Sequence, residues 1–205
     1  RLSNLRTVGA EHTYPGRKCL TKLWETLRSH TYGSLDAVTA LTSEGKLWLE
    51  NNTNAKNVLV IPNSVSWPLP DIEPHLYPNA VYKSERKLLL AVGRFNPVKA
   101  FDLLIEAFAK VADKHPNWDL NIVGEGRLRS ELEAQIEKLN FKNRVLLPGR
   151  AGNIGEWYEA ADLYVMSSHH EGFPMTLVEA MAYGVASVSF DCDTGPRDIF
   201  RHEVD

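Results

Sequence analysis

The hydrophobic and polar residues follow a regular pattern from residue 87 onward. Short apolar runs alternate there with segments whose apolar residues recur at helical spacing. Such runs predict buried strands, and such segments predict amphipathic helices; in the last helix, Leu177 and Met181 are expected to share the apolar face. The expected strands are 88–92, 120–123, 145–147, 163–166 and 186–190, and the expected helices are 103–111, 128–139, 154–161 and 176–183. This alternation predicts an α/β fold with a doubly wound, Rossmann-like parallel sheet.

The first 65 residues carry a shorter version of the same alternation. Apolar runs at 7–10, 36–41 and 58–61 predict strands. Helices are expected at 20–27 and 45–50, with Ser43 as the N-cap of the second. The prolines between Ser66 and Lys83 interrupt this pattern. We therefore expect the end of an amino-terminal domain at 1–65, a linker at 66–86 and a carboxyl-terminal domain at 87–205.

Composition limits the classes of function. The 205 residues are 43% hydrophobic and 24% charged, which is typical of a globular protein. A net charge of −3 gives no electrostatic reason to expect nucleic acid as a partner. No apolar run is long enough to span a membrane, and Cys19 and Cys192 are expected to be reduced thiols in a cytoplasmic protein. Because the chain starts at Arg1 and stops after a strand-like run, we expect both ends to be cut from a longer protein.

The segment from Glu171 to Glu179 is the most informative stretch, because it crosses from a loop into a helix with a carboxylate on each side of the junction. The amides of Gly172, Phe173 and Met175 are expected around the helix N-terminus, which is a ready site for an anion. Carboxylates accept hydrogen bonds from hydroxyls. The segment therefore suits a nucleotide sugar, in which a diphosphate joins two polyols.

Further polar clusters follow other expected strands. Gly93, Arg94 and Lys99 come after the first strand of the carboxyl-terminal domain, and two cations there suit a diphosphate leaving group. Gly124 follows the next strand, where a flat base could lie on the backbone, and Arg150 follows the third. Taken singly, each cluster also fits a plain turn or a solvated loop. Because ligands bind at the carboxyl ends of strands in doubly wound sheets, we expect one shared site.

Histidines and acidic pairs give no metal site at this stage. His169 and His170 are adjacent on an extended loop, so their side chains point apart. Asp191 and Asp193 form a DxD pattern that we interpret as a turn lining the crevice. A lone histidine is usually structural, but His12 ends a strand of the amino-terminal domain and is kept as a candidate facing the cleft.

Together these residues resemble the retaining GT-B-fold glycosyltransferases of family 4, also called glycosyl transferases group 1. The family includes bacterial polysaccharide and lipopolysaccharide transferases. The segment 171–188 is similar to its E-x7-E signature, and segments 61–63, 93–99, 122–126 and 161–162 match in the family's order. The resemblance implies a GT-B-type fold, with a nearly complete carboxyl-terminal nucleotide-sugar-binding domain and the end of the amino-terminal, acceptor-side domain.

The resemblance also implies roles for single residues. Glu171 contacts the donor sugar, Glu179 binds the ribose hydroxyls, and Arg94 and Lys99 neutralise the departing diphosphate. His12 lies near the sugar and the acceptor. Neither a metal nor another cofactor is expected, since the cations and the helix end take the place of a metal. Ala100 stands where the family usually has glycine, and we expect a slightly shifted helix start. The other expected donor contacts are Gly172, Phe173, Pro174, Met175, Thr176, Gly93, Gly124 and Arg150.

The expected activity is retaining transfer of a hexose or N-acetylhexosamine from a UDP-linked donor to a growing surface glycan. If the acceptor is linked to a lipid, the enzyme works at the inner membrane leaflet. Basic residues near the acceptor side then face anionic lipid, or they form an ordinary solvated helix face. These residues are Arg1, Arg6, Arg17, Lys18, Lys22 and Arg28.

Two alternatives to transfer are open at this point. One is a nucleotide-sugar-binding module or an epimerase-like member without glycosyl transfer, because its fold and carboxylates would be the same. The other is a dinucleotide oxidoreductase. It is disfavoured because the chain lacks GxGxxG followed by an acidic strand end.

Overall fold

The computed structural model describes residues 5–17, 20–82, 85–192 and 194–200, so Cys19 and Asp193 lie outside the described residues. The chain forms two compact units. The smaller unit holds the described residues up to Ser64 together with 171–174, 191–192 and 194–200. The larger unit holds 65–170 and 175–190. The end of the chain therefore contributes to both units.

The larger unit is built on a five-stranded sheet with the strand order β6-β5-β4-β7-β8. Every neighbouring pair is parallel. The strands are β4 (Lys87–Val92), β5 (Trp118–Val123), β6 (Val145–Gly149), β7 (Leu163–Met166) and β8 (Ser187–Ser189). The chain adds β5 and β6 on one side of β4 and then β7 and β8 on the other. This reversal confirms the predicted doubly wound parallel sheet.

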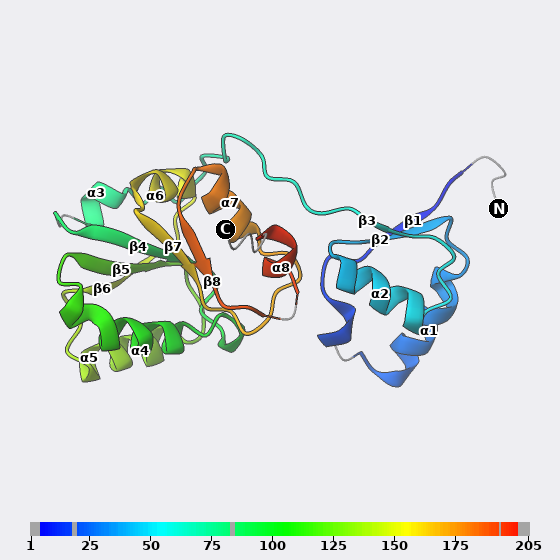
Figure 1. Ribbon diagram of the computed structural model, residues 1–205, viewed down its shortest axis with the longest axis horizontal. Helices are drawn as coiled ribbons and strands as arrows, with labels where there is room; N and C mark the ends of the chain where they lie inside the picture. Colours follow the sequence, from blue (N-terminus) through cyan, green and yellow to red (C-terminus); the bar gives the residue numbers. More distant parts are fainter. Residues whose placement is uncertain (1–4, 18–19, 83–84, 193, 201–205) are drawn as a thin grey trace, which may run out of the picture. The chain divides into compact units, whose positions relative to one another are not determined.

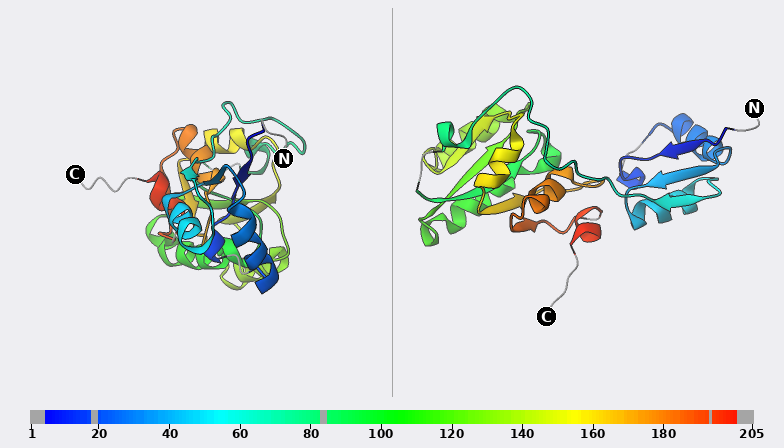
Figure 2. Two further views of the ribbon diagram at one scale, coloured as in Figure 1. Left: turned by 90° about the vertical axis from the view of Figure 1, so that its right-hand side faces the viewer. Right: turned by 90° about the horizontal axis from the view of Figure 1, so that it is seen from above.

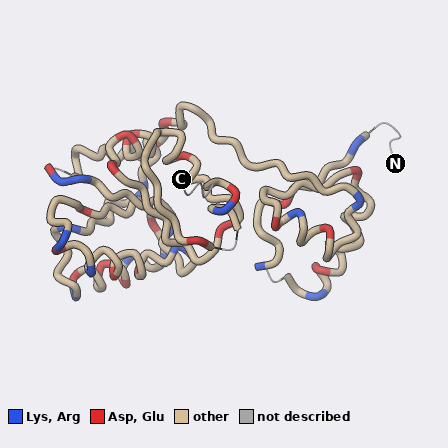
Figure 3. The backbone as a smooth tube through the Cα atoms, in the orientation of Figure 1, with Lys and Arg blue, Asp and Glu red and all other residues tan. Residues whose placement is uncertain are grey.

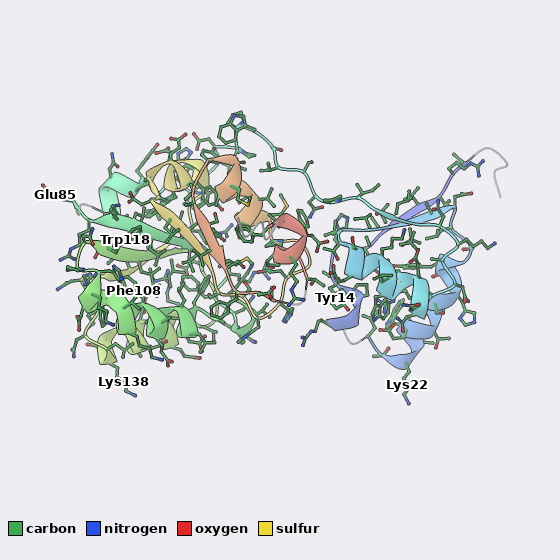
Figure 4. All side chains as sticks on the ribbon, in the orientation of Figure 1. Tyr14, Lys22, Glu85, Phe108, Trp118 and Lys138 are labelled. Atoms are coloured by element: carbon green, nitrogen blue, oxygen red, sulfur yellow. The ribbon has the colours of Figure 1, made fainter. Side chains whose placement is uncertain are left out.

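Helices cover both faces of this sheet (Figure 1). On one face lie α4 (Phe101–Val111) and α5 (Arg129–Lys138); the side chains of α4, Phe108 among them, fill the space beneath the sheet (Figure 4). On the other lie α6 (Ile154–Ala160) and α7 (Met175–Ala182). Short 3-10 turns at Pro97–Lys99 (η2) and Ala112–Lys114 (η3) flank α4.

One detail of α7 differs from the expectation. Leu177 is fully buried, but its buried partner is Ala180, and Met181 is 41% exposed. The helix has only eight residues, and its buried side chains are an i,i+3 pair, Leu177 and Ala180. The predicted pairing of Leu177 with Met181 on the buried face is wrong.

The segment 66–86, expected as a linker, is itself part of the larger unit in its described residues. It carries a short helix, α3 (Pro78–Val81), which the sequence pattern did not predict. The Leu76 N–H donates to Asn153 Oδ1 at 2.8 Å, and Trp157 Nε1–H donates to the Leu76 carbonyl at 2.7 Å. The Gly152 N–H donates to the Pro74 carbonyl at 2.7 Å. These bonds attach the segment to the start of α6.

The smaller unit has a three-stranded parallel sheet in the order β1-β2-β3, visible from above in Figure 2. Val38, Ala40 and Val58 are buried beneath the helices, whereas Leu59, which points the other way, is 45% exposed. The elements are β1 (Val8–Ala10), η1 (Pro15–Arg17), α1 (Lys22–Tyr32), β2 (Ala37–Ala40), α2 (Ser43–Asn52), β3 (Val58–Val60) and α8 (Pro196–Ile199).

The N-cap of α2 corrects a sequence prediction. The helix begins at Ser43, and the residue before it, Thr42, is the N-cap. The Gly45 N–H donates to Thr42 Oγ1 at 3.1 Å, so the threonine hydroxyl satisfies one of the amides that the first turn leaves unpaired. Ser43 is therefore not the N-cap, because the helix starts two residues before the expected Gly45.

The expected basic surface of the smaller unit also changes. Arg28 is buried; it forms ion pairs with Glu25 and Glu11 and lies over the Trp48 ring. It therefore does not face lipid, while Arg1 and Lys18 lie outside the described residues. Charges of both signs are interspersed along each unit (Figure 3). Within the described residues, no helix has the length and apolar character needed to cross a bilayer.

Candidate functional site

The carboxyl ends of β4 and β5 approach each other so closely that glycine is required. A Cβ on Gly124, whose φ is 153°, would lie 1.8 Å from the Gly93 carbonyl oxygen. A Cβ on Gly126 would lie 2.4 Å from the Phe95 carbonyl oxygen. The Phe95 N–H donates to the Glu125 carbonyl at 2.8 Å and ties the two loops together. The glycines therefore leave a strip of backbone without side chains at the carboxyl ends of β4 and β5.

A pocket of about 540 Å³ opens beside this strip, within the range of small-molecule sites. It lies at the carboxyl ends of β4, β5 and β6, next to the strand where the sheet order reverses. The predicted site residues that line it are Gly93, Arg94, Gly124, Arg150 and Glu179. Tertiary structure therefore brings together residues that come from four separate segments.

Lys99 stands next to this pocket, at the end of η2. Its N–H donates to Asn96 Oδ1 at 3.2 Å, and Ser167 Oγ–H donates to its carbonyl at 2.7 Å. A Cβ placed on the pocket residue Gly93 would lie 3.3 Å from Lys99 Cε, so the lysine stem runs alongside it. Ala100 follows with a φ of 48° and is fully buried. Glycine suits this position because glycine adopts the left-handed backbone conformation without steric cost.

Glu179 lies in the second turn of α7 and lines the pocket. Burial raises the pKa of Glu179, and a hydrogen bond from the Tyr158 hydroxyl to Oε2, at 3.0 Å, partly offsets this. A half-buried carboxylate in a pocket is a strong acceptor for ligand hydroxyls. Sequence reasoning missed Tyr158. The helix that carries it was expected only from the spacing of its apolar residues, and a tyrosine within such a pattern does not indicate a functional site.

Glu125 is a second acidic residue in the pocket lining and was not singled out from the sequence. Arg129 Nε–H donates to Glu125 Oε2 at 2.8 Å. The hydrogen bonds from Arg129 lower the pKa of the Glu125 carboxyl, and the charges of Arg129 and Arg150 add to this. The positive charges of these arginines thereby offset much of the negative charge of Glu125. Its place directly after a strand end was the available signal.

In the smaller unit, the loop before α7 lies close to His12. A Cβ on Gly172 would lie 3.2 Å from the His12 carbonyl oxygen. Thr194 Oγ1–H donates to the Glu171 carbonyl, and Pro174 is buried. Phe173 lies in the same loop, while Met175 and Thr176 open α7 in the larger unit. The predicted site residues therefore form one group in each unit.

The acidic pair at 191–193 provides no metal site among the residues described. Asp191 Oδ1 accepts a hydrogen bond from Arg197 Nε–H at 2.6 Å, and Asp193 lies outside those residues. Within the described ranges, no group of three or more histidine, cysteine, aspartate or glutamate side chains is placed to hold a metal ion. Asp191 is thus used in an ion pair within the last segment of the chain.

Comparison with known proteins identifies the family. Residues 78–205, more than half of the chain, match the family described as glycosyl transferases group 1. The amylovoran biosynthesis glycosyltransferase AmsD of Erwinia amylovora is 31% identical over 183 residues, which is 86% of this chain and 49% of that protein. An alpha-1,4-N-acetyl-D-galactosaminyltransferase of Campylobacter jejuni, named for a glycan on diphospho-undecaprenol, is 28% identical over 90% of this chain and 49% of its own.

A solved structure extends the likeness to the fold. A mutant of TarM from S. aureus, in complex with fondaparinux, alpha-GlcNAc-glycerol and UDP, superposes with a TM-score of 0.79 and 25% identity, over 97% of this chain and 39% of TarM. This likeness confirms the predicted GT-B-type, Rossmann-like α/β fold. The chain spans about half the length of the curated relatives it matches. It belongs to the glycosyl transferases group 1 family.

Proposed function

We propose that this chain provides the donor side of a retaining glycosyltransferase of family 4. The enzyme moves a hexose or N-acetylhexosamine from a UDP-linked donor to a growing surface glycan. The observation that carries the proposal is the pocket at the ends of β4, β5 and β6. It combines a half-buried carboxylate, Glu179, with Arg94 and a glycine backbone strip. This combination suits a ribose, a diphosphate and a flat base.

The chemistry is stabilisation of the charge that develops on the departing diphosphate. Arg94 and Lys99 supply positive charge, and the amides at the start of α7 add oriented dipoles. In this proposal they do the work that a divalent metal does in other transferases. Glu179 holds the ribose, and Arg150 and Gly124 border the base.

In the same proposal, Glu171 and His12 act at the sugar end of the donor. Glu171 accepts hydrogen bonds from the donor sugar, and the amides of Gly172 and Phe173 bind the sugar or the diphosphate. His12 lies near the acceptor. The close approach of Gly172 to the His12 backbone within the smaller unit supports this grouping. Retention follows from attack by the acceptor on the same face from which the diphosphate leaves.

The proposed acceptor is a glycan or a lipid-linked glycan, and the proposed location is the cytoplasm, with peripheral contact at the inner membrane leaflet. The Campylobacter relative supports a lipid-linked acceptor by its name. Leu23, Trp24 and Leu27 of α1 are exposed, at 66%, 60% and 41%. Exposed apolar side chains next to Lys22 suit the surface of an anionic membrane. Cosedimentation with anionic and neutral vesicles tests this part.

The test of the site is calorimetric titration of the purified full-length protein with UDP, GDP and ADP in the presence of EDTA. Tight binding of UDP is expected. Glu179→Ala and Lys99→Ala are each expected to weaken it by about tenfold or more, because each removes a charge-assisted contact worth about 1.5–3 kcal/mol. Glu131→Ala and Lys110→Ala, which remove exposed charges from α5 and α4, are the matched controls.

Unchanged affinity in both site variants would refute the assignment of the site. The reaction itself is tested by incubating the UDP-sugar with an acceptor glycan. NMR of the product is expected to show the same anomeric configuration as the donor. Normal binding of the UDP-sugar without any UDP release would instead favour a binding module, and UDP release that does not depend on acceptor would favour an epimerase-like member. An inverted product would refute the retaining mechanism.

A further inference from the structure

Two fully buried tyrosines lie behind α7, and both hydroxyls reach this helix. Tyr158 comes from α6 and Tyr164 from β7. The Tyr158 hydroxyl lies 3.0 Å from Glu179 Oε2 and 3.2 Å from the Thr176 carbonyl oxygen. The Tyr164 hydroxyl donates to Thr176 Oγ1 at 2.8 Å. Of the two, Tyr158 is the one that touches a side chain lining the pocket.

The Tyr158 hydroxyl carries one hydrogen and faces two acceptors. The Thr176 carbonyl lies in the first turn of α7, where the amide four residues later is its regular partner. An ionised carboxylate is the stronger acceptor, and its hydrogen bonds are roughly twice as strong as neutral ones. The hydroxyl therefore donates to Glu179. With Tyr158 fully buried, no solvent competes for this bond.

The ring of Tyr158 is itself fixed by packing. Its centroid lies 6.1 Å from that of Tyr164, in a T-shaped contact, and 5.7 Å from that of Tyr183. A glutamate side chain has three rotatable bonds and loses considerable conformational freedom when it is ordered. Anchoring one oxygen to a rigid hydroxyl removes that freedom before a ligand arrives. The other oxygen is then left for a ligand in the pocket that Glu179 lines.

We propose that Tyr158 is a positioning residue, which holds one carboxylate oxygen of Glu179 and so presents the other to the ribose hydroxyls of a bound nucleotide. This inference rests on the proposed function, since that proposal assigns the ribose to Glu179. It adds a residue outside the pocket lining to the recognition of the ribose. Preorganisation of this kind strengthens binding because less ordering remains to be done when the ligand binds.

The experiment compares two ligands in calorimetric titrations of the full-length protein: UDP and 2′,3′-dideoxyuridine diphosphate, which lacks the ribose diol. The test variant is Tyr158→Phe, which removes the hydroxyl and keeps the ring contacts. It is expected to bind UDP about tenfold more weakly, and to bind the dideoxy ligand within about twofold of the wild type. Tyr164→Phe is the matched control, because it removes the neighbouring buried hydroxyl, which does not bond to Glu179.

The outcomes separate the two proposals. Wild-type protein that binds UDP no better than the dideoxy ligand, or binds neither, would overturn the proposed site and this inference together. Wild-type preference for UDP that Tyr158→Phe leaves unchanged would overturn only the role of Tyr158. Equal weakening of both ligands by Tyr158→Phe would also overturn it, because a purely structural defect does not distinguish the diol. A selective loss also seen in Tyr164→Phe would assign the effect to α7 as a whole.

Discussion

Asn121 offers a sharp test of the energetics of the larger unit. It lies in the middle of β5, opposite Leu90 of β4 and Leu146 of β6, and its side chain is fully buried. Neither Oδ1 nor Nδ2 has a hydrogen-bond partner among the described residues. Its immediate strand neighbours, Leu120 and Ile122, point into the core under α4 and α5. The side-chain amide of Asn121 is therefore buried at a central position of the sheet, and no hydrogen bond within the described residues compensates for its loss of hydration.

We predict that Asn121→Leu stabilises the protein. Burying an amide without a partner costs about 1–3 kcal/mol in protein mutational data, and leucine has the same branched shape without the polar atoms. Leucine also adds apolar burial, while slight overpacking takes back part of the gain. We expect a net increase of about 1–3 kcal/mol in the free energy of unfolding. For a chain of this size, Tm rises by roughly 2–4 °C for each kcal/mol.

The assay is differential scanning calorimetry of wild type and variant, with Asn153→Leu as the matched control. Asn153 is also buried, but its Oδ1 accepts from the Leu76 N–H at 2.8 Å and its Nδ2 donates to Glu156 Oε1 at 3.1 Å. The same substitution there is expected to destabilise by about 1–3 kcal/mol, because it leaves the partly buried Leu76 N–H unpaired. A Tm for Asn121→Leu at or below that of the wild type would refute the reasoning.

Two further predictions concern residues of the site. Because the folded-state pKa of Glu179 is raised above its ordinary 4.5, the carboxyl destabilises the fold progressively as pH rises through that raised value, and this effect is absent below 4.5. Glu179→Gln should therefore raise Tm at pH 7 but not at pH 4, and an equal gain at both would contradict this. Gly126→Ala should destabilise by about 1–3 kcal/mol in urea unfolding, since its Cβ would lie 2.4 Å from the Phe95 carbonyl oxygen. Gly184→Ala, which has a φ of 73° but open space around it, isolates the backbone cost, and a larger loss there than at Gly126 would refute the contact argument.

The strands were predictable because parallel sheets buried on both faces require continuous apolar runs. Each of the runs from 88–92 to 186–190 overlaps an observed strand, with ends that differ by up to two residues. The short helices α3 and α8 escaped prediction, since four residues are too few to show helical periodicity. The burial of Arg28 escaped it as well, because its ion partner Glu11 lies far along the chain.

The candidate site was partly visible in the sequence. Gly93, Arg94 and Gly124 stood out because they follow strand-like runs, and their meeting in one pocket follows from parallel strands ending at a common edge. Glu125 and Tyr158 did not stand out. Their importance comes from contacts with Arg129 and Glu179, made by side chains whose orientation no local pattern records.

The sequence by itself determined the order and kind of the elements in the carboxyl-terminal part, because local apolar periodicity reflects which face of each element is buried. It also determined the residue types that suit a nucleotide sugar. Only the tertiary structure decided that the segment 66–86 packs against α6, that Gly124 and Gly126 must be glycine, and that Glu179 is tied to Tyr158. These features depend on atoms brought together from distant parts of the chain, and their distances are set by packing rather than by spacing in sequence.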